Sequence, residues 1–520
     1  MTRIAFILLA TLPVVAAAQS TMTMHPYRES HPLRAPTQGG WLEDRSIDLA
    51  ADSGTCSVAE DRSQADGRRI RLPIVRFRAT DTAAYPPVMW FSGGPGQSNM
   101  GSLRYDTFID SSDHIMVGYR GVDEEVSLDC PEIVEILESA GDILDTAVIR
   151  QVAEGYGACA ERLRVTGVDV RNYTAVNVAQ DIEEARAALG IDKITIVAES
   201  FGTRIAYYYA VLYPERVHRM ILIGANPPGR MVWDPRQCDS LLGRYGELWK
   251  QDSNAVRRAP DLVEAIRRVH ADFPKRWLFF PIHEGTVKAA MNAFLFHRGT
   301  AAQGFDTYVA AAQGDPSGVW LFSFVGGRIF PTVVNWGDNA SKAMSADFEP
   351  GRDYYHELMP EGAILGAPLG AFLWGAGQSG MWPVTRIPER FRSVETCSTA
   401  TLILSGSLDF STPPMNAEAE FIPHFPNGKH VVMLEAGHIA DLWELQPEVT
   451  AHLLRTFVRT GNVDTSCIRY VSMSFAVSWG FPVLAKIVVG GGVLLAGLIV
   501  FGIWRLARVW RRRSGRRMIP

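Results

Sequence analysis

Residues 177–224 constrain the fold most strongly, because helix and strand patterns alternate there within a short stretch. Residues 177–189 show helical spacing of apolar positions, and residues 193–198 form a β-branched run typical of a buried strand. Residues 201–213 are helical again, and residues 219–224 form a further apolar strand. Strands separated by helices pair in parallel, so this order predicts a parallel sheet covered by helices.

Further strand patterns extend this sheet in both directions along the chain. Residues 69–78 partly alternate like a half-buried strand, while residues 87–91 and 114–119 are typical of short buried strands followed by turns. After a long interruption, residues 401–405 and 430–434 resume the strand pattern. We therefore expect one sheet domain whose strands come from two separate parts of the chain.

The interruption covers residues 228–388, where helical stretches alternate with connections rich in glycine, proline and tryptophan. We interpret it as a largely helical cap inserted into the sheet domain. The two parts of that domain are then residues 19–227 and residues 389–467. A cap at this point would cover the carboxyl edge of the sheet, where parallel strands place their ligand sites.

Ser200 is the candidate nucleophile. It lies between a predicted strand and a predicted helix, with Ala198 and Gly202 on either side in the order Ala-Glu-Ser-Phe-Gly. A nucleophile on such a turn has strained backbone, and bulky flanking side chains would collide with the neighbouring strands. Alanine replaces the usual first glycine here and is still small. The pattern predicts a nucleophile elbow at Ser200.

A serine hydroxyl needs a base that takes its proton, and the base needs an acid that orients it. Asp409 ends one predicted strand and His438 follows the next, in the order this architecture requires. We predict that Asp409 orients His438, and that His438 removes the Ser200 proton and later delivers it to the leaving group. Glu435 and His430 are the alternative acid and base.

The turn from Ser92 to Gly96, Ser-Gly-Gly-Pro-Gly, directly follows a predicted strand. A glycine-rich turn in this place can direct a backbone N–H at a developing oxyanion. We predict an oxyanion hole made by the N–H groups of Gly94 and Phe201. The alternative is an ordinary Gly-Pro loop.

Together these motifs resemble the tripeptidyl aminopeptidase and prolyl iminopeptidase group of α/β-hydrolases, over most of residues 50–465. The matching pieces are Gly93 to Gly96, Tyr119 to Gly121, residues 181–217, Asp409 with Thr412 and Pro413, and Gly437 with His438. The resemblance implies an α/β-hydrolase fold and cleavage of peptides or amides at a free amino terminus. The chain departs from the group at Ser92, where a histidine is usual, at Gly118, where an aspartate is usual, and at residues 122–126, which replace a glycine-serine turn.

The amino terminus predicts a cleavable secretory signal over residues 1–18. Arg3 precedes an apolar run, and Ala16 to Ala18 supply the small residues that a signal peptidase requires. The run is short for a membrane span. We therefore expect an exported protein whose mature chain begins near Gln19.

The other end predicts a transmembrane helix over residues 485–506, since Ile487 to Trp504 carry no charge. Seven arginines follow this span, and no acidic residue follows Asp464. The positive-inside rule then places the basic tail, residues 507–520, in the cytoplasm and the catalytic domain on the periplasmic or extracellular side. The alternatives are a buried core helix with a basic end, and a sorting signal that is cut near Gly490 to Gly492.

Charge and cysteine content exclude several classes of protein. The formal charge is −5, but ten of the 51 basic residues lie in the terminal segments, so the domain between them is distinctly acidic. An acidic domain is a poor binder of nucleic acid. Six cysteines in an exported chain favour disulfides over metal. If all six are joined, 15 connectivities are possible, and the pair that we expect first is Cys130 with Cys159. With neither a CxxC nor an HExxH pattern, we expect no metal and no cofactor.

The leading function is an exported, membrane-anchored serine hydrolase that removes amino-terminal residues or short peptides. A carboxylesterase on the same scaffold is the close alternative, and a binding ectodomain that has kept the fold without catalysis is the third. An aminopeptidase would use a carboxylate to hold the free ammonium of its substrate. The acids considered for this role in the cap are Glu247, Asp252, Asp261, Glu264 and Glu284. The sequence singles out none of them, and it leaves the oligomeric state open.

Overall fold

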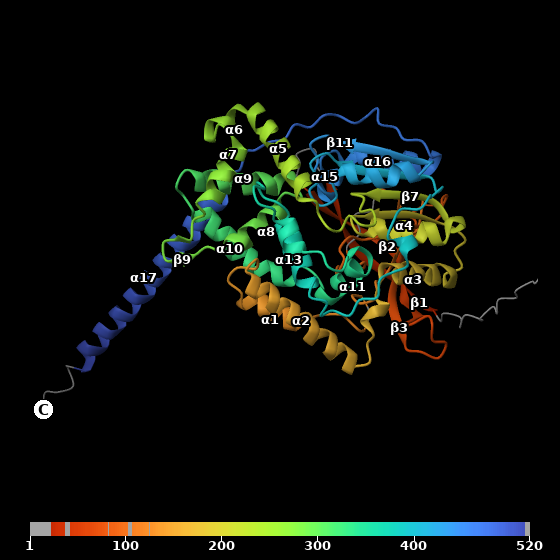
Figure 1. The fold of residues 1–520 in the computed structure, drawn as a ribbon, viewed down its shortest axis with the longest axis horizontal. Coiled ribbons are helices and arrows are strands. Elements are labelled where there is room, and N and C mark those ends of the chain that lie inside the picture. The colour runs from red at the N-terminus through yellow and green to blue at the C-terminus, as the bar shows by residue number, and fades with distance from the viewer. Residues whose placement is uncertain (1–21, 37–41, 82, 102–106, 124, 515–520) are drawn as a thin grey trace, which may run out of the picture.

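The computed structural model describes residues 22–36, 42–81, 83–101, 107–123 and 125–514 (Figure 1). Its centre is a nine-stranded sheet in the order β1-β2-β3-β5-β4-β6-β7-β10-β11. The strands are β1 (Met22–Pro36), β2 (Leu42–Ala59), β3 (Arg69–Phe77), β4 (Val88–Phe91), β5 (His114–Val117), β6 (Ile194–Glu199), β7 (Val217–Ile223), β10 (Thr401–Gly406) and β11 (Gly428–Met433). The predicted signal peptide lies outside the described residues, as does the end of the basic tail.

The sheet is mostly parallel, as predicted. The strands from β5 to β11 in the sheet order all pair in parallel, while β1, β2 and β3 pair antiparallel and β3 joins β5 antiparallel. Every strand predicted from sequence is present within a few residues of its expected bounds. The long β1–β2 pair at the edge was not predicted, because its sequence shows no alternation of apolar residues and contains several prolines.

Helices cover both faces of the sheet. Along β6, the side chain of Ile196 packs with the cluster that includes α3 (Ala175–Ala188) and α4 (Gly202–Leu212), and that of Val197 packs with the cluster that includes α16 (Pro447–Thr460). This alternation explains why the strand has apolar residues on both faces, with Thr195 and Glu199 as its polar positions: each face has its own helical cover.

A third layer is helical and lies beside the sheet (Figure 1). Between β7 and β10 the chain forms α5 (Pro235–Gln251), α6 (Ser253–Arg258), α7 (Leu262–Ala271), α8 (Glu284–Phe294), α9 (Arg298–Ala312), α10 (Ser317–Ile329), α11 (Trp336–Asp347), α12 (Tyr354–Leu358) and α13 (Pro368–Gly377). These helices occupy the predicted cap segment. The exact division of the chain into core and cap remains a prediction.

Two helices from another part of the chain belong to the same layer. The helices α1 (Pro131–Ser139) and α2 (Thr146–Val165) share one apolar cluster with α8, α10 and α13. The predicted disulfide between Cys130 and Cys159 is confirmed and joins the start of α1 to α2, with an S–S distance of 2.05 Å. The other four cysteines are free, and Cys467 is the exposed one among them.

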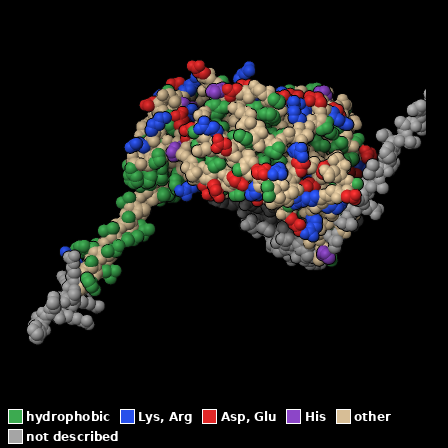
Figure 2. Space-filling model, turned by 60° about the horizontal axis from the view of Figure 1, so that its bottom comes forward, with side chains coloured by type: hydrophobic (Ala, Val, Ile, Leu, Met, Phe, Trp, Pro, Cys, Tyr) green, Lys and Arg blue, Asp and Glu red, His purple; other side chains and the backbone are tan. Residues whose placement is uncertain are grey.

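The chain ends in one long helix, α17 (Phe481–Ser514), which projects from the body (Figures 1 and 2). Among the described residues, the stretch Phe481–Arg508 is long and apolar enough by itself to cross a bilayer, and its most apolar window is not buried against the rest of the protein. A soluble core helix would bury such a surface, so the helix fits a single-pass membrane anchor. The remaining short helices that follow β10 and β11 are α14 (Pro414–Asn416) and α15 (Ile439–Glu444).

Candidate active site

Ser200 occupies the tight turn between β6 and α4. Its φ angle is +51°, a left-handed conformation that is strained for a residue with a side chain. A Cβ atom on Gly202 would lie 2.2 Å from the carbonyl oxygen of Phe91, so this position requires glycine. Ala198 instead pairs with Phe91 inside the sheet and is fully buried, where a methyl group fits. The local geometry is that of a nucleophile elbow.

The structure brings together the three residues that the sequence predicted from distant segments. Ser200 Oγ lies 3.1 Å from His438 Nε2, and His438 Nδ1 lies 2.7 Å from Asp409 Oδ2. Asp409 follows β10, and His438 follows β11 at the start of α15. Parallel strands end at one edge of the sheet, which is why residues far apart in sequence meet here. In this arrangement Nδ1–H donates to Asp409 and Nε2 can accept the Ser200 hydroxyl proton.

Asp409 is fully buried yet well provided with donors. Its carboxylate accepts hydrogen bonds from the backbone N–H groups of Ser411 and Thr412 and from the Thr412 hydroxyl, each at 2.8 Å. Burial raises the pKa of Asp409, but His438 and the Thr412 hydrogen bonds outweigh it and hold the pKa below its ordinary value. Asp409 is therefore ionised at neutral pH and can orient the imidazole.

His438 is tied to the helical layer through its backbone. Its N–H donates to the carbonyl oxygen of Phe296, in the connection between α8 and α9. Asp441 strengthens this link, because its carboxylate accepts from the N–H of Gly437 at 2.7 Å and from the N–H of Arg298 at 2.9 Å. The ring of His297 lies 6.4 Å from that of His438, and burial lowers the pKa of His297, so a neutral imidazole borders the site.

The predicted oxyanion turn lies against the elbow. A Cβ atom on Gly93 would come within 2.9 Å of Ser200 Cβ, and Gly94 has a φ of +121° that suits glycine. Gly94 and Phe201 both line the cavity that contains Ser200. The turn is also anchored to the sheet by the buried side chain of Asn99, which accepts from the N–H of Ser92 at 2.7 Å.

Helix α11 clamps this turn from the other side. Asp338 accepts from the N–H of Gly96 at 3.0 Å, Asn339 donates to the carbonyl oxygen of Pro95 at 3.2 Å, and the N–H of Asn335 donates to the carbonyl oxygen of Gly96 at 2.8 Å. Lys342 Nζ lies 2.7 Å from the Asp338 carboxylate, and both side chains are buried. A buried ion pair of this kind is a costly feature unless its geometry is good.

The sequence did not identify this clamp. Its signals were an asparagine at a helix N-cap and an Asp338–Lys342 pair four residues apart, which are equally typical of an exposed helix. At its far end the helix is fixed again, because Asp347 forms a buried pair with Arg204 of α4 at 2.7 Å. Helix α11 therefore connects the predicted oxyanion turn with the helix that follows Ser200.

A cavity of about 470 Å³ opens onto Ser200 and His438. Its wall is largely apolar and comes from both the sheet edge and the helical layer. The larger apolar lining residues include Met231, Trp233, Phe296, Trp336, Leu369 and Leu373. Glu199 carries the one carboxylate among the described residues that line it, and its Oε1 accepts from Trp443 Nε1 at 2.6 Å.

The alternative acid and base have other partners. His430 Nε2 lies 3.0 Å from Ser405 Oγ, and the Glu435 carboxylate accepts from the Tyr470 hydroxyl and the N–H of Met473. The five cap acids considered for ammonium binding are likewise absent from the described cavity lining. Three of them form ion pairs elsewhere, Glu284 with Lys288, and both Asp261 and Glu247 with Lys250.

Residues 155–445, more than half of the chain, match the family model for the α/β hydrolase fold. The chain belongs to the α/β-hydrolase fold family. Among relatives of this α/β-hydrolase, the tripeptidyl aminopeptidase of Streptomyces coelicolor is 27% identical over 256 residues, which cover 45% of this chain and 46% of that protein. The serine protease Hip1 of Mycobacterium tuberculosis is 30% identical over 193 residues, which cover 34% of this chain and 36% of that protein.

Among solved structures, the proline iminopeptidase of Mycobacterium smegmatis aligns with 78% of this α/β-hydrolase and 97% of its own chain, at 14% identity and a TM-score of 0.38. The matched segments span about half the length of the tripeptidyl aminopeptidase and about a third of the length of Hip1.

Proposed function

We propose that this protein is a serine hydrolase that forms an acyl-enzyme on Ser200, with His438 as the base and Asp409 as the residue that orients it. The observation that carries the proposal is the continuous hydrogen-bonded arrangement from Ser200 Oγ through His438 to the buried Asp409, at 3.1 Å and 2.7 Å. This arrangement opens into a cavity large enough for a small acyl group and leaving group.

In this mechanism His438 Nε2 accepts the proton of Ser200 while Oγ attacks the substrate carbonyl. The tetrahedral oxyanion is stabilised by the N–H groups of Gly94 and Phe201. His438 then donates the proton to the leaving nitrogen, and the carbon–nitrogen bond breaks to give the acyl-enzyme and a free amine. Water, deprotonated by His438, attacks the ester and releases the acid.

The test of this mechanism is active-site labelling with a fluorophosphonate, which reacts with an activated serine hydroxyl. We expect the wild-type protein to be labelled and Ser200→Ala to be unlabelled. Ser411→Ala is the matched control, because Ser411 lines the same cavity but its hydroxyl is not part of the proposed triad. Equal labelling of the wild-type protein and Ser200→Ala would contradict the assignment of Ser200 as the nucleophile, and absence of labelling of the folded wild-type protein would favour the non-catalytic binding ectodomain.

For the substrate, we propose an aminopeptidase that releases amino-terminal residues or short peptides. The supporting observations are the names of the two relatives, a tripeptidyl aminopeptidase and a serine protease, and the position of Glu199 as the one acid among the described residues that line a largely apolar cavity. A carboxylate there favours a free ammonium over a blocked terminus. The apolar wall also suits the acyl group of a carboxylesterase substrate, which remains the second candidate.

Arylamides and esters separate the two candidates. An aminopeptidase should cleave unblocked aminoacyl or tripeptidyl arylamides far faster than their N-acetylated forms. Equal cleavage of blocked and unblocked arylamides, or turnover of short-chain esters alone, would assign the esterase function instead.

We also propose that the protein is exported and that α17 anchors it in a membrane, with the catalytic domain outside and the arginine-rich end in the cytoplasm. The exposed apolar surface of α17 and the Cys130–Cys159 disulfide, which is typical of an oxidising compartment, support this location. The test is protease treatment of intact cells. We expect a protease added outside to cleave the catalytic domain and to leave the cytoplasmic tail uncut.

A further inference from the structure

A short hairpin beside α17 presents large apolar side chains to solvent. The strands β8 (Arg276–Trp277) and β9 (Phe280–Pro281) pair antiparallel, and Leu278 and Phe279 form the tip. Their exposed fractions are 59% and 77%, values at which a soluble surface gains nothing from an aromatic or aliphatic residue. Apolar residues grouped at a projecting tip mark a contact surface.

The hairpin is fixed to α10 by a series of stacked aromatic rings. The ring of Phe279 lies 4.2 Å from that of Phe280, and Phe280 stacks on Trp320 at 4.6 Å. Trp320 in turn stacks at 5.8 Å on Phe324, which is itself 48% exposed. The tip therefore has a defined position on the body and continues into an exposed apolar residue of α10.

Helix α10 is also the support on which α17 rests. A Cβ atom on Gly318 would lie 2.7 Å from the Pro482 ring, the ring of Phe481 lies 5.2 Å from that of Phe322, and Lys486 forms an ion pair with Asp315 at 2.5 Å. The first turns of α17 thus pack directly against α10. The hairpin contacts α10 at Trp320, two residues from Gly318.

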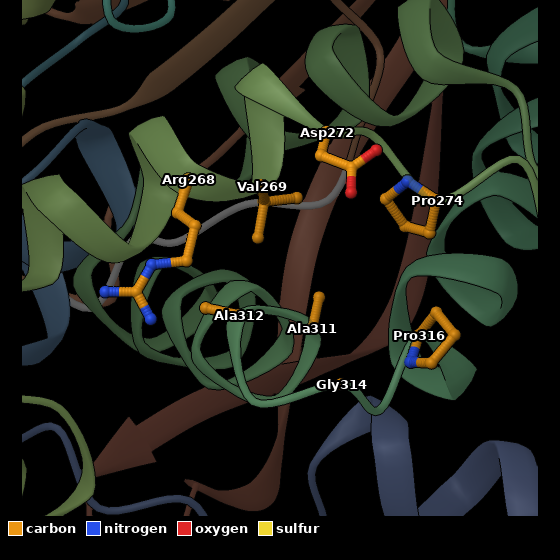
Figure 3. Close-up of a pocket in the computed structure, with 8 residues that line it drawn as sticks. All are labelled: Arg268, Val269, Asp272, Pro274, Ala311, Ala312, Gly314 and Pro316. Carbon is orange, nitrogen blue, oxygen red and sulfur yellow. The ribbon is translucent and has the colours of Figure 1, made fainter.

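The figures show the same neighbourhood from two sides. In Figure 1, β9 lies beside the point where α17 leaves the body, and in Figure 2 hydrophobic side chains gather at the base of this helix. Figure 3 shows the hollow that separates α7 from the end of α9, lined by Asp272 and Pro274 on the approach to the hairpin and by Gly314 and Pro316 on the approach to α10. The chain runs from Pro274 into the hairpin, and Asp315 lies between Gly314 and Pro316, so both segments continue directly from residues that line this hollow.

The length of the apolar span sets the depth of this surface. A hydrocarbon core of about 30 Å needs about 20 helical residues. Counting back that length from Arg505, the first arginine after the span, places the outer boundary of the hydrocarbon near Lys486. Lys486 pairs with Asp315, two residues before α10 begins, and the hairpin packs on the same helix at Trp320. We therefore place the hairpin near the level of the lipid headgroups.

The residues around the tip suit that environment. Lys275 and Arg276 are exposed at the base of the hairpin, and the Arg328 guanidinium lies 5.0 Å above the Phe324 ring. Trp277 completes a sequence, Lys-Arg-Trp-Leu-Phe-Phe, that combines basic and aromatic residues. Aromatic rings favour the membrane interface, and basic side chains favour anionic headgroups.

We propose that the β8–β9 hairpin is a second membrane contact, with Leu278 and Phe279 inserted into the headgroup region of the bilayer that α17 spans. This inference rests on the proposed membrane anchor. With α17 alone, the catalytic domain could rotate about the axis of this helix. A second contact at the interface restricts that rotation and fixes the orientation of the domain on the membrane.

The experiment uses the full chain with Cys467→Ser, since Cys467 is the exposed native thiol. A single new cysteine at position 279, Phe279→Cys, carries an environment-sensitive fluorophore, and the protein is reconstituted in vesicles of phosphatidylcholine and phosphatidylglycerol. We expect a blue-shifted emission, and about twofold or greater quenching by a lipid nitroxide near the headgroup relative to one at the chain end, because interfacial insertion is shallow.

Two further positions make the outcome decisive. Val165→Cys is the matched control, an exposed apolar residue at the end of α2. It should show no lipid quenching. Val493→Cys in α17 reports the anchor itself and should be quenched by the deeper nitroxide. Quenching at 493 without quenching at 279 would overturn the hairpin proposal and keep the anchor, and so would a label at 279 that aqueous iodide quenches as strongly as the label at 165. Absence of quenching at 493 would overturn the anchor and the hairpin proposal together.

Discussion

The turn that carries Ser200 and the turn from Ser92 to Gly96 lie against each other, yet different parts of the chain fix them. Ser200 is held by β6 before it and α4 after it, elements that the surrounding twenty residues build by themselves. The Gly96 backbone is held by Asp338, 242 residues further along the chain. One half of the site is therefore local in sequence, and the other half depends on tertiary structure.

This difference gives the helical layer a second role. An insertion above a sheet edge is usually considered a cover that selects substrates. Here α11 also supports the backbone that we propose to stabilise the oxyanion, and its Arg204–Asp347 pair ties it to the helix after Ser200. Substitutions in α11 should lower the rate by displacing the Gly96 turn. Substitutions at the Ser200 turn should lower it by removing or displacing the nucleophile.

The largest expected effect concerns the local half. Ser200→Ala and His438→Ala should each lower kcat by about 10⁶, because attack and proton transfer act as one unit, and Asp409→Asn should lower it by about 10⁴. Steady-state turnover of an arylamide or ester measures this. Circular dichroism should show an intact fold, and Ser411→Ala should keep kcat within a few fold. Near-normal turnover by folded Ser200→Ala would refute the mechanism.

The next effect concerns the tertiary half. Asp338→Ala leaves Lys342 buried without its counter-charge and should lower the free energy of unfolding by about 3–5 kcal/mol. The double variant Asp338→Leu/Lys342→Met removes both charges and should recover most of that stability, measured by urea unfolding.

The same double variant separates stability from positioning. It lacks an acceptor for the N–H of Gly96, so kcat should stay about 10- to 100-fold below that of the wild-type protein, less than the loss of an oxyanion donor itself. Asp338→Asn/Lys342→Met restores an acceptor and should recover kcat. If both double variants turn over equally, α11 does not position the turn.

A smaller effect is expected from the disulfide in the helical layer. Cys130→Ser should lower the free energy of unfolding by roughly 3–4 kcal/mol, the value that loop entropy gives for a disulfide that closes a loop of this size. Residual structure in the unfolded state would make the measured loss smaller. Turnover of the folded protein should hardly change. Cys467→Ser, at the exposed free thiol, is the control and should leave the unfolding curve unchanged. A loss of kcat in folded Cys130→Ser would show that α1 and α2 also position the site.

The smallest effect returns to the elbow. Ala198→Gly restores the residue usual at the first position and should lower the free energy of unfolding by about 0.5–1 kcal/mol, because glycine loses more entropy in a strand. The kcat should stay within about twofold, since the methyl group packs inside the sheet and does not face the reaction. Gly202→Ala, where a Cβ atom meets the Phe91 carbonyl, should instead be severely destabilised, and equal stability of the two variants would contradict this account of the turn.

The sequence predicted what is determined locally. Strands β4, β6, β7, β10 and β11 were predicted because each is a short apolar run bounded by turns, and the parallel order followed from the helices between them. Ser200, Asp409 and His438 were predicted as a triad because each follows a strand within a few residues, and the structure places their side chains within hydrogen-bond distance of one another in that order. The disulfide pairing was found because its two cysteines flank one short excursion.

What the sequence missed depends on contacts between distant segments. The β1–β2 pair forms by pairing of β2 with β3, which lies further along the chain, and its own sequence has no pattern that predicts a strand. The roles of Asn335, Asp338 and Asn339 follow from the approach of α11 to the Gly96 turn, which no local pattern encodes. Glu199 was passed over because a residue next to the nucleophile looks like part of the turn, and its place in the cavity wall is a property of the folded chain.

The hydrogen bond from the His438 backbone to Phe296 has a consequence for dynamics. A motion of the helical layer that moves Phe296 must either break this hydrogen bond or carry the His438 backbone with it. A motion that keeps the bond would displace the imidazole from Ser200. Access and reactivity are thus mechanically coupled, so the open state would be inactive, and a long polypeptide would meet a reactive serine through an end that threads into the closed site.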